Sequence, residues 1–269
     1  MLCIGGRGFI GQRLSKMMPF QSLSRQTGFD IKCDPLPPLQ STDTVINLVG
    51  LLHDQPNNTM EQVQLDAVKR IVGFMKDIKC HYVHVSAIGS DPSSSIPYAR
   101  TKGLCEQYLM EHYKEHTMIL RPSIVFGPGD GFIQRFKRLS AYLPLLPVFS
   151  SAQFQPVHVD DLCQVIRKVT KHRKVGRMDV GGPDVYTYQE LIELVLHKTN
   201  RKRLVMPLPL PLTRAMAYGL QYLPDEMDLK MTPDQLSMLQ SDNVADNSTL
   251  LQFMKDHQWQ GLDDLELVK

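Results

Sequence analysis

Apolar and polar positions follow two periods along this chain, which predict strands and helices in turn. Short apolar runs predict buried parallel strands at residues 1–4, 20–24, 29–33, 43–49, 82–85, 115–120 and 178–180. Apolar residues at helical spacing predict helices at residues 8–18, 61–76, 132–142, 162–169 and 187–197. A proline-rich stretch, 34–38, replaces the helix expected after the third strand. Strands alternating with helices indicate an α/β protein.

The first predicted strand ends in a glycine-rich turn. Gly5, Gly8 and Gly11 follow at intervals of three, and a helical run begins after Gly11. A nucleotide pyrophosphate binds bare backbone N–H groups at a helix amino terminus, where the helix dipole favours its charge. The first glycine lets the chain turn, the second lets the phosphates approach, and the third lets helix and strand pack closely. An ordinary glycine turn is the alternative.

The end of the second strand indicates which nucleotide would bind. In a dinucleotide fold this position faces the adenosine ribose, where a carboxylate holds the free 2′-hydroxyl of NAD and an arginine accommodates a 2′-phosphate. Ser24 and Arg25 stand there with no carboxylate near, and Arg7 in the glycine turn adds a second positive charge. Both features favour NADP(H) over NAD(H). The alternative is that both arginines are ordinary surface residues.

A second group of residues has the chemistry of acid–base catalysis. Tyr98 and Lys102 are four apart, so on a helix they share one face. A phenol has a pKa near ~10, and a nearby ammonium is expected to lower the pKa of Tyr98. Lys102 could also hold the nicotinamide ribose. Ser86, at the end of the preceding strand, or a later serine among 90 and 93–95 could polarise a substrate carbonyl.

Composition and charge limit the remaining classes. The net charge is +2 and the pI is about 8.2, and we interpret the basic residues as dispersed apart from Arg201-Lys202-Arg203. This charge distribution does not indicate nucleic-acid binding. Five cysteines show no metal-binding spacing and predict reduced, mostly buried thiols and no metal site. Three prolines within residues 204–223 argue against a membrane-spanning helix there.

Several further features allow more than one interpretation. His158 is either a substrate ligand or a packed structural histidine. The apolar stretch 205–223 is either a docking surface for a partner or membrane, or part of the packing of a small lobe. Residues Thr187–Glu190 and Thr232–Gln235 each predict a capped helix start.

Together these motifs resemble the extended and atypical short-chain dehydrogenase/reductase superfamily over essentially the whole chain. The resemblance rests on the glycine turn, Ser86, Tyr98-xxx-Lys102, Arg121-Pro122 and residues 157–161. Finer matches at 45–50, 84–89, 122–127, 155–158, 207–211 and 231–244 are similar to one subgroup. That subgroup contains the NAD(P)-binding accessory subunit of respiratory complex I and a related protein of ubiquinone biosynthesis.

The resemblance implies a Rossmann-like, doubly wound parallel sheet of seven strands with a small C-terminal lobe. It places a core NAD(P)-binding domain at 1–150, and the last Rossmann elements with a substrate or partner lobe at 151–269. It implies catalytic roles for Tyr98, Lys102 and Ser86 if the protein is active. The expected cofactor contacts are Gly5, Gly6, Arg7, Gly8, Phe9, Ile10, Gly11, Ser24, Arg25, Leu48, Val49, Gly50, Val85, Ser86, Tyr98, Lys102, Pro122, Ser123 and Ile124.

The function implied by the subgroup is that of an accessory or assembly subunit of mitochondrial complex I with a mainly structural NADP(H). Its partners would be other subunits of that complex, with peripheral contact to the inner membrane through 205–223, on the matrix side. Ala87 and Ile88 stand where active relatives usually carry further hydroxyls, which favours a binding scaffold. The alternatives are an active NADP(H)-dependent oxidoreductase or epimerase, acting on a quinone precursor, and a nucleotide-sensing regulator.

Overall fold

The computed structural model describes residues 1–220, 222 and 233–262. The chain forms two compact units, the first comprising 1–122, 159–180 and 245–257 and the second comprising 123–158, 181–244 and 258–269. Each unit contains three chain segments, because helix α5 (Val159–Lys171) and sheet strand β10 (Gly176–Val180) return to the first unit after the chain has entered the second. The single boundary at residue 150 expected from the sequence does not coincide with these units.

The first unit is built on a parallel sheet with the strand order β10-β5-β4-β3-β1-β2. Its strands are β1 (Leu2–Ile4), β2 (Gln21–Leu23), β3 (Thr44–Asn47), β4 (His81–Val85), β5 (Thr117–Pro122) and β10 (Gly176–Val180). This confirms the Rossmann-like α/β class, and among described residues the sheet has six strands where seven were expected.

The strand expected at residues 29–33 is wrong, which accounts for one missing strand. These residues form a turn in which carboxylates satisfy the backbone locally. The amide of Asp30 donates to Asp34 Oδ2 at 2.6 Å, and the amide of Lys32 donates to Asp30 Oδ1 at 2.9 Å. Aspartate side chains offer such local bonds in competition with a strand ladder.

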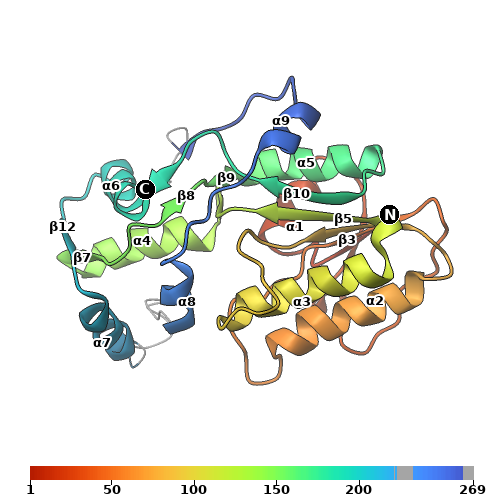
Figure 1. Cartoon of the computed structure of the whole chain (residues 1–269), viewed down its shortest axis with the longest axis horizontal. Coiled ribbons are helices and arrows are strands. Elements are labelled where there is room, and N and C mark those ends of the chain that lie inside the picture. The colour runs from red at the N-terminus through yellow and green to blue at the C-terminus, as the bar shows by residue number, and fades with distance from the viewer. Residues whose placement is uncertain (221, 223–232, 263–269) are drawn as a thin grey trace. The chain divides into compact units, whose positions relative to one another are not determined.

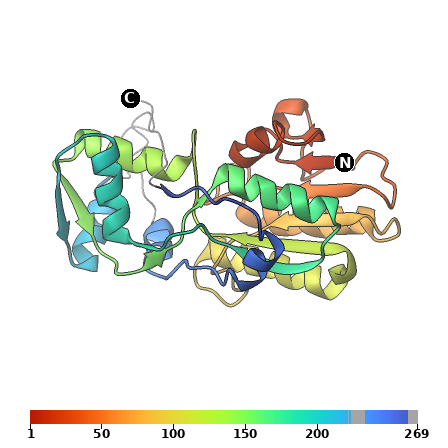
Figure 2. The ribbon, with the colours of Figure 1, turned by 90° about the horizontal axis from the view of Figure 1, so that it is seen from above.

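Helices cover both faces of this sheet (Figure 1). One face carries α2 (Ala67–Met75), which continues a π-helical segment at Glu61–Asp66, and α3 (Pro97–His112); their apolar residues share a core with the strands. The other face carries α1 (Phe9–Leu14) and α5 (Val159–Lys171), which contact each other. The short helix α9 (Ser248–Phe253) lies beside α5 and contacts β10, as Figure 2 also shows. Helix α1 ends well before residue 18, where the sequence placed its end.

The second unit contains four helices and three small strand pairs among the described residues. The helices are α4 (Gly131–Tyr142), α6 (Tyr188–Lys198), α7 (Leu210–Leu220) and α8 (Pro233–Met238). The pairs are β6 (Val125–Phe126) with β9 (Val157–His158), β7 (Leu145–Val148) with β12 (Leu204–Pro207), and β8 (Gln153–Phe154) with β11 (Tyr186–Thr187). Apolar residues of α4 and α6 pack together in the hydrophobic core of the second unit. The capping box at Thr187 and Glu190 is confirmed, whereas Thr232 lies outside the described residues.

Two further sequence expectations concern the cysteines and membrane-spanning helices. Cys3, Cys80, Cys105 and Cys163 are buried free thiols and Cys33 is exposed, which confirms that most cysteines are buried. Across 1–220, 222 and 233–262, no helix is long and apolar enough to cross a membrane.

Candidate functional site

The glycine turn joins β1 to α1 with close contacts that require glycine. Gly5 has a φ of +80°, and a Cβ there would lie 3.2 Å from Val49 Cγ2. A Cβ on Gly11 would lie 2.5 Å from the Cα and carbonyl of Gly6, so a side chain would separate helix and turn. A Cβ on Gly8, by contrast, would meet only the carbonyl oxygen of Gly5, at 3.2 Å. The turn therefore has the close packing and the open backbone that a pyrophosphate requires.

The groups around this turn are arranged as the dinucleotide expectation requires. Gly8 is extended at the amino terminus of α1, and Phe9 and Ile10 form the first helical residues. Ser24 directly follows β2, and the amide of Gly5 donates to the carbonyl of Leu23 at 2.9 Å. Arg7 and Arg25 are exposed, and neither pairs with a carboxylate among residues that the structure describes. The residues present therefore fit a nucleotide with an extra phosphate.

Lys102 connects the carboxyl ends of two central strands. Its side chain is buried, and Nζ donates to the carbonyl of Val85 at 2.9 Å and to that of Val49 at 3.3 Å. A Cβ on Gly50 would lie 3.7 Å from this ammonium, so Gly50 keeps the approach to Lys102 open. Burial lowers the pKa of Lys102. An ammonium has three N–H donors, and these are the two bonds that Nζ makes to described residues.

Tyr98 does not have the lowered pKa expected from the sequence. Burial raises the pKa of Tyr98 to about 12, and Lys102 is not among the causes of this shift. The four-residue spacing does place both residues on α3. However, the ammonium of Lys102 is directed at the strand carbonyls, and burial penalises the phenolate. The expectation was wrong because spacing fixes a shared helix face but not the direction of the side chains.

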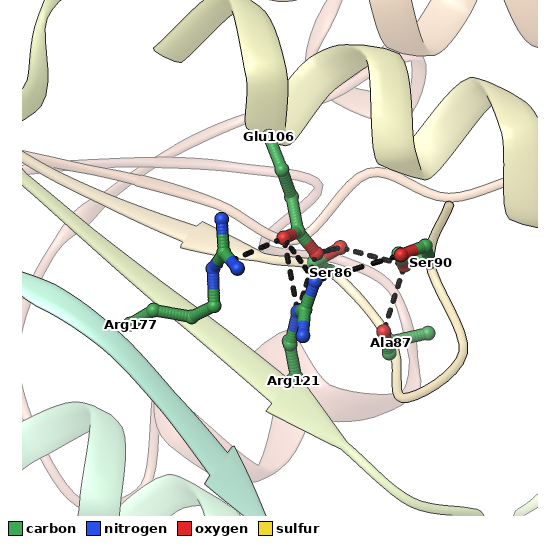
Figure 3. Close-up of polar contacts among 6 residues, drawn as sticks. All are labelled: Ser86, Ala87, Ser90, Glu106, Arg121 and Arg177. Atoms are coloured by element: carbon green, nitrogen blue, oxygen red, sulfur yellow. Dashed lines mark hydrogen bonds and ion pairs between the residues drawn. The ribbon is translucent and has the colours of Figure 1, made fainter. Parts of the chain in front are cut away.

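The hydroxyl of Ser86 donates a hydrogen bond to the carboxylate of Glu106 (Figure 3). Its Oγ lies 2.6 Å from Glu106 Oε1, and both side chains are buried. Arg121 Nη2 approaches Glu106 Oε2 at 2.7 Å, and Arg177 Nε lies 3.4 Å from the same oxygen. The Ser86 hydroxyl is therefore not free in this arrangement to polarise a substrate carbonyl. Ser90, the next candidate, donates to the carbonyl of Ala87 at 2.7 Å.

The remaining expected contacts lie at strand ends in both units. Leu48 and Val49 follow β3, and the amide of Val49 donates to Asn47 Oδ1 at 3.0 Å. Pro122 ends β5 in the first unit. In the second unit, Ser123 Oγ lies 2.6 Å from Asn243 Oδ1, and Ile124 packs against the core of that unit.

Sequence reasoning missed three polar groups of the first unit, of which Glu106 and His84 are buried and Arg121 is partly exposed. Glu106 stands four residues after Lys102 on α3, so helical spacing could have revealed it. Arg121 was noted only as part of a motif. His84 is buried with neither ring nitrogen hydrogen-bonded in the described part of the chain, and burial places its pKa well below its usual value. Its position in the buried strand predicted at 82–85 is the sequence signal for this burial.

Two other candidates have structural surroundings in the second unit. His158 is buried and meets the ring of Phe126 edge to face at 5.2 Å between centroids, which favours its structural interpretation. Arg201 donates to Ser140 Oγ at 2.9 Å and Arg203 Nε donates to the carbonyl of Ser140 at 2.7 Å. These arginines therefore cap the end of α4. Within the described ranges, no cluster of metal-ligating side chains occurs.

No family model matches the chain. It is 26% identical over 164 residues to NADH dehydrogenase (ubiquinone) 1 alpha subcomplex subunit 9, mitochondrial, of Dictyostelium discoideum, covering 60% of this chain and 46% of that protein. The Arabidopsis thaliana protein of the same name is 26% identical over 221 residues, covering 79% of this chain and 54% of that one. The chain thus spans about half the length of these relatives. A ceramide reductase of Caulobacter vibrioides is 22% identical over 175 residues, which are 64% of this chain and 55% of that protein.

Solved structures share the fold. A dTDP-4-dehydrorhamnose reductase of Clostridium acetobutylicum superposes with a TM-score of 0.66 at 13% identity, covering 94% of this chain and 91% of that chain. The Bacillus anthracis enzyme in complex with NADP gives a TM-score of 0.62 at 15% identity, over 78% and 84%. The chain therefore shares its Rossmann-like fold with these solved reductases. Within it, the resemblance to the complex I subunit subgroup indicated by the sequence is confirmed by the relatives.

Proposed function

We propose that this chain is an accessory or assembly subunit of mitochondrial respiratory complex I that holds NADP(H) mainly as a structural ligand. The relatives named as NADH dehydrogenase subunits align with 60% and 79% of the chain. They support a mitochondrial location and other subunits of the complex as partners. Placement on the matrix side of the inner membrane is part of the same proposal.

The observation that carries the structural role is that two catalytic-type side chains, Ser86 and Lys102, make hydrogen bonds within the protein. Ser86 donates to Glu106, and Lys102 donates to the carbonyls that end β3 and β4. NADP(H), when bound, would supply a hydride, but Ser86 and Lys102 are bonded within the protein, and burial raises the pKa of the third group, Tyr98. The ammonium of Lys102 would bind a ribose hydroxyl, and the glycine turn would bind the pyrophosphate.

The choice of NADP(H) rests on Arg7 and Arg25. Both are exposed without a carboxylate partner in the described part of the chain, so either can meet a 2′-phosphate. Replacing both by alanine removes charge-assisted hydrogen bonds, and we expect NADPH binding to weaken by about ten- to a hundred-fold. NADH binding should stay within about twofold, because it lacks the phosphate. Isothermal titration of the full chain with each nucleotide measures both, and an equal loss for NADH would contradict the preference.

The stretch 205–223 is the proposed contact to neighbouring subunits or the inner membrane. Among its described residues and their neighbours, large apolar side chains are exposed at Leu204, Met206, Leu212, Tyr218 and Tyr222. Residues 204–223 contain no acidic side chain and follow Arg201-Lys202-Arg203. Exposed apolar groups of this kind mark interaction surfaces.

Native electrophoresis of solubilised mitochondria from the source organism tests the assignment. The tagged full chain should migrate with NADH dehydrogenase activity at the mobility of the intact complex, and nucleotide extracted from that band should be NADP(H). A chain found only as free protein would overturn the assignment. A disrupted sample, treated to dissociate the complex, should release the tag to low mass and serves as the control.

The second candidate is an active NADP(H)-dependent oxidoreductase or epimerase acting on a quinone precursor or related lipid. It is favoured by the presence of Tyr98 and Lys102 on one helix and by the relative named as a ceramide reductase. It requires that NADPH be oxidised when a quinone precursor is added, and that Tyr98→Phe abolish this. A bound nucleotide that neither exchanges nor reacts would exclude it.

A further inference from the structure

The carboxyl-terminal end of α5 and the turn after it carry a concentrated positive charge. Residues 162–176 contain five lysines and arginines and no acidic residue, namely Arg167, Lys168, Lys171, Arg173 and Lys174. The expectation that basic residues are dispersed is wrong here, because the net charge of +2 conceals this local excess.

Two of these cations are fixed in place by Phe253 of α9. The ammonium groups of Lys168 and Lys174 each lie 4.9 Å from the centre of its ring, and Lys168 also donates to the carbonyl of Phe253. His172 meets the same ring edge to face at 6.2 Å between centroids. Cation–π contacts of this kind hold flexible lysine side chains at defined positions.

Arg173 has a separate, structural role. Its guanidinium donates to the backbone carbonyls of Ser41 and Thr42, each at 2.9 Å, and so holds the loop before β3. We define the α5 basic surface as Arg167, Lys168, Lys171 and Lys174. Arg167 and Lys171 are exposed, and neither pairs with a carboxylate among residues described in the structure.

The acidic residues of α5 do not neutralise this surface. Asp160 and Asp161 stand at the opposite end of the helix, where Arg13 Nε donates to Asp160 Oδ1 at 2.7 Å and Asp161 lies 2.9 Å from His257 Nε2. Cations near a helix carboxyl terminus interact favourably with the helix dipole. The helix dipole acts within the last turn and is balanced by one or two charges. It therefore does not account for the four cations of the α5 basic surface.

We propose that the α5 basic surface docks an acidic segment of a partner protein. Ordered cations around one aromatic ring present fixed positions to which individual carboxylates can bind. A membrane-binding surface needs exposed apolar side chains that can insert into the lipid. In the turn before β10 and on α9, the exposed large apolar side chains are only Val175 and Leu251. The inference rests on charge and geometry and does not depend on nucleotide binding or on membership of complex I.

The test uses the full chain and a fluorescein-labelled glutamate-rich peptide, with its glutamine counterpart as the uncharged control. Fluorescence anisotropy should show binding of the glutamate peptide that weakens as salt is raised. Arg167→Glu with Lys171→Glu should weaken binding by about tenfold, because two attractive charges become repulsive. Lys16→Glu with Lys76→Glu makes the same charge change at exposed positions outside the α5 basic surface and should weaken binding less than about twofold.

Three outcomes would overturn the proposal. The first is an equal loss of binding in both double variants, which would show a general charge effect. The second is no binding of the glutamate peptide by the wild-type chain. The third is binding only to phosphatidylcholine vesicles that contain phosphatidylserine, lost in the Arg167/Lys171 variant, which would assign the surface to lipid. None of these outcomes would affect the complex I assignment, which the native gel tests separately.

Discussion

The glycine turn and the tyrosine–lysine–serine group both belong to the first unit, but they use their polar groups differently. In the turn, close packing at Gly5 and Gly11 leaves backbone exposed for a phosphate. In the second group, Ser86 and Lys102 bind to Glu106 and to strand carbonyls. The features needed to hold a nucleotide are present, whereas Ser86 and Lys102 are already bonded and burial raises the pKa of Tyr98. Binding and chemistry can therefore be separated in this fold.

The largest expected effect tests the turn. Gly11→Ala places a methyl group 2.5 Å from the backbone of Gly6, so α1 must move away. We expect a loss of stability of about 3 kcal/mol and loss of bound nucleotide. Gly73→Ala is the matched control, because nothing lies within 4 Å of the new methyl in α2 and alanine favours a helix by about 0.5–1 kcal/mol. Urea unfolding and nucleotide content measure both variants. A Gly11→Ala protein that keeps its nucleotide would show that this packing is dispensable.

The second prediction tests the hydrogen-bonded group around Ser86 and Glu106. Glu106→Gln removes the charge that Arg121 and Arg177 face, while the amide keeps the shape of the side chain. Breaking one partner of a buried pair costs several kcal/mol, and because the amide still accepts hydrogen bonds we expect about 2 kcal/mol. Glu111→Gln, exposed on the same helix, should change stability by less than about 0.5 kcal/mol. If both variants unfold at the same urea concentration, the Glu106 network does not stabilise the strand ends.

The third prediction uses His84, which lies on β4 next to these groups. Its pKa in the folded protein is well below the usual value, mainly because of burial and secondly because of Lys102. Above pH ~6.5 both folded and unfolded states are neutral at this residue, so it contributes no pH dependence. As pH falls below ~6.5 the unfolded state takes up a proton that the folded state does not, and stability falls by up to about 1.4 kcal/mol per pH unit.

His84→Leu should therefore flatten the loss of stability between pH ~7 and ~5.5 by about one proton. The exposed His53→Leu is the control and should leave the slope unchanged. His81, whose pKa burial also lowers, remains in both variants and retains part of the slope. Urea unfolding at several pH values gives the slopes. Equal slopes for wild type and His84→Leu would mean that His84 takes up its proton equally in the folded and unfolded states, so that burial does not lower its pKa.

The same comparison explains what the sequence could predict. The turn was predictable because the spacing of Gly5, Gly8 and Gly11 between a strand and a helix is itself the sequence pattern of such a turn. The state of Tyr98 and Ser86 was not, because it depends on where Lys102 and Glu106 direct their side chains, and helical spacing does not determine that. The strand expected at 29–33 failed for a similar reason, since Asp30 and Asp34 satisfy its backbone locally. Most other strands were predictable because parallel strands buried on both faces have unbroken apolar runs.

The smallest expected effect is also the most decisive for function. Tyr98→Phe removes only a phenolic oxygen, and no hydrogen bond of this oxygen occurs within the described residues. We expect stability to change by less than about 0.5 kcal/mol, because no buried partner loses a bond. In the source organism the variant should restore complex I assembly, respiration and quinone content to wild-type levels. Gly11→Ala, which disturbs the binding turn, should not. If Tyr98→Phe instead accumulates normally but reproduces the deletion phenotype, then the phenol acts in catalysis. In that case the Ser86–Glu106 bond must open during turnover, and chemistry in this unit would not be separable from binding.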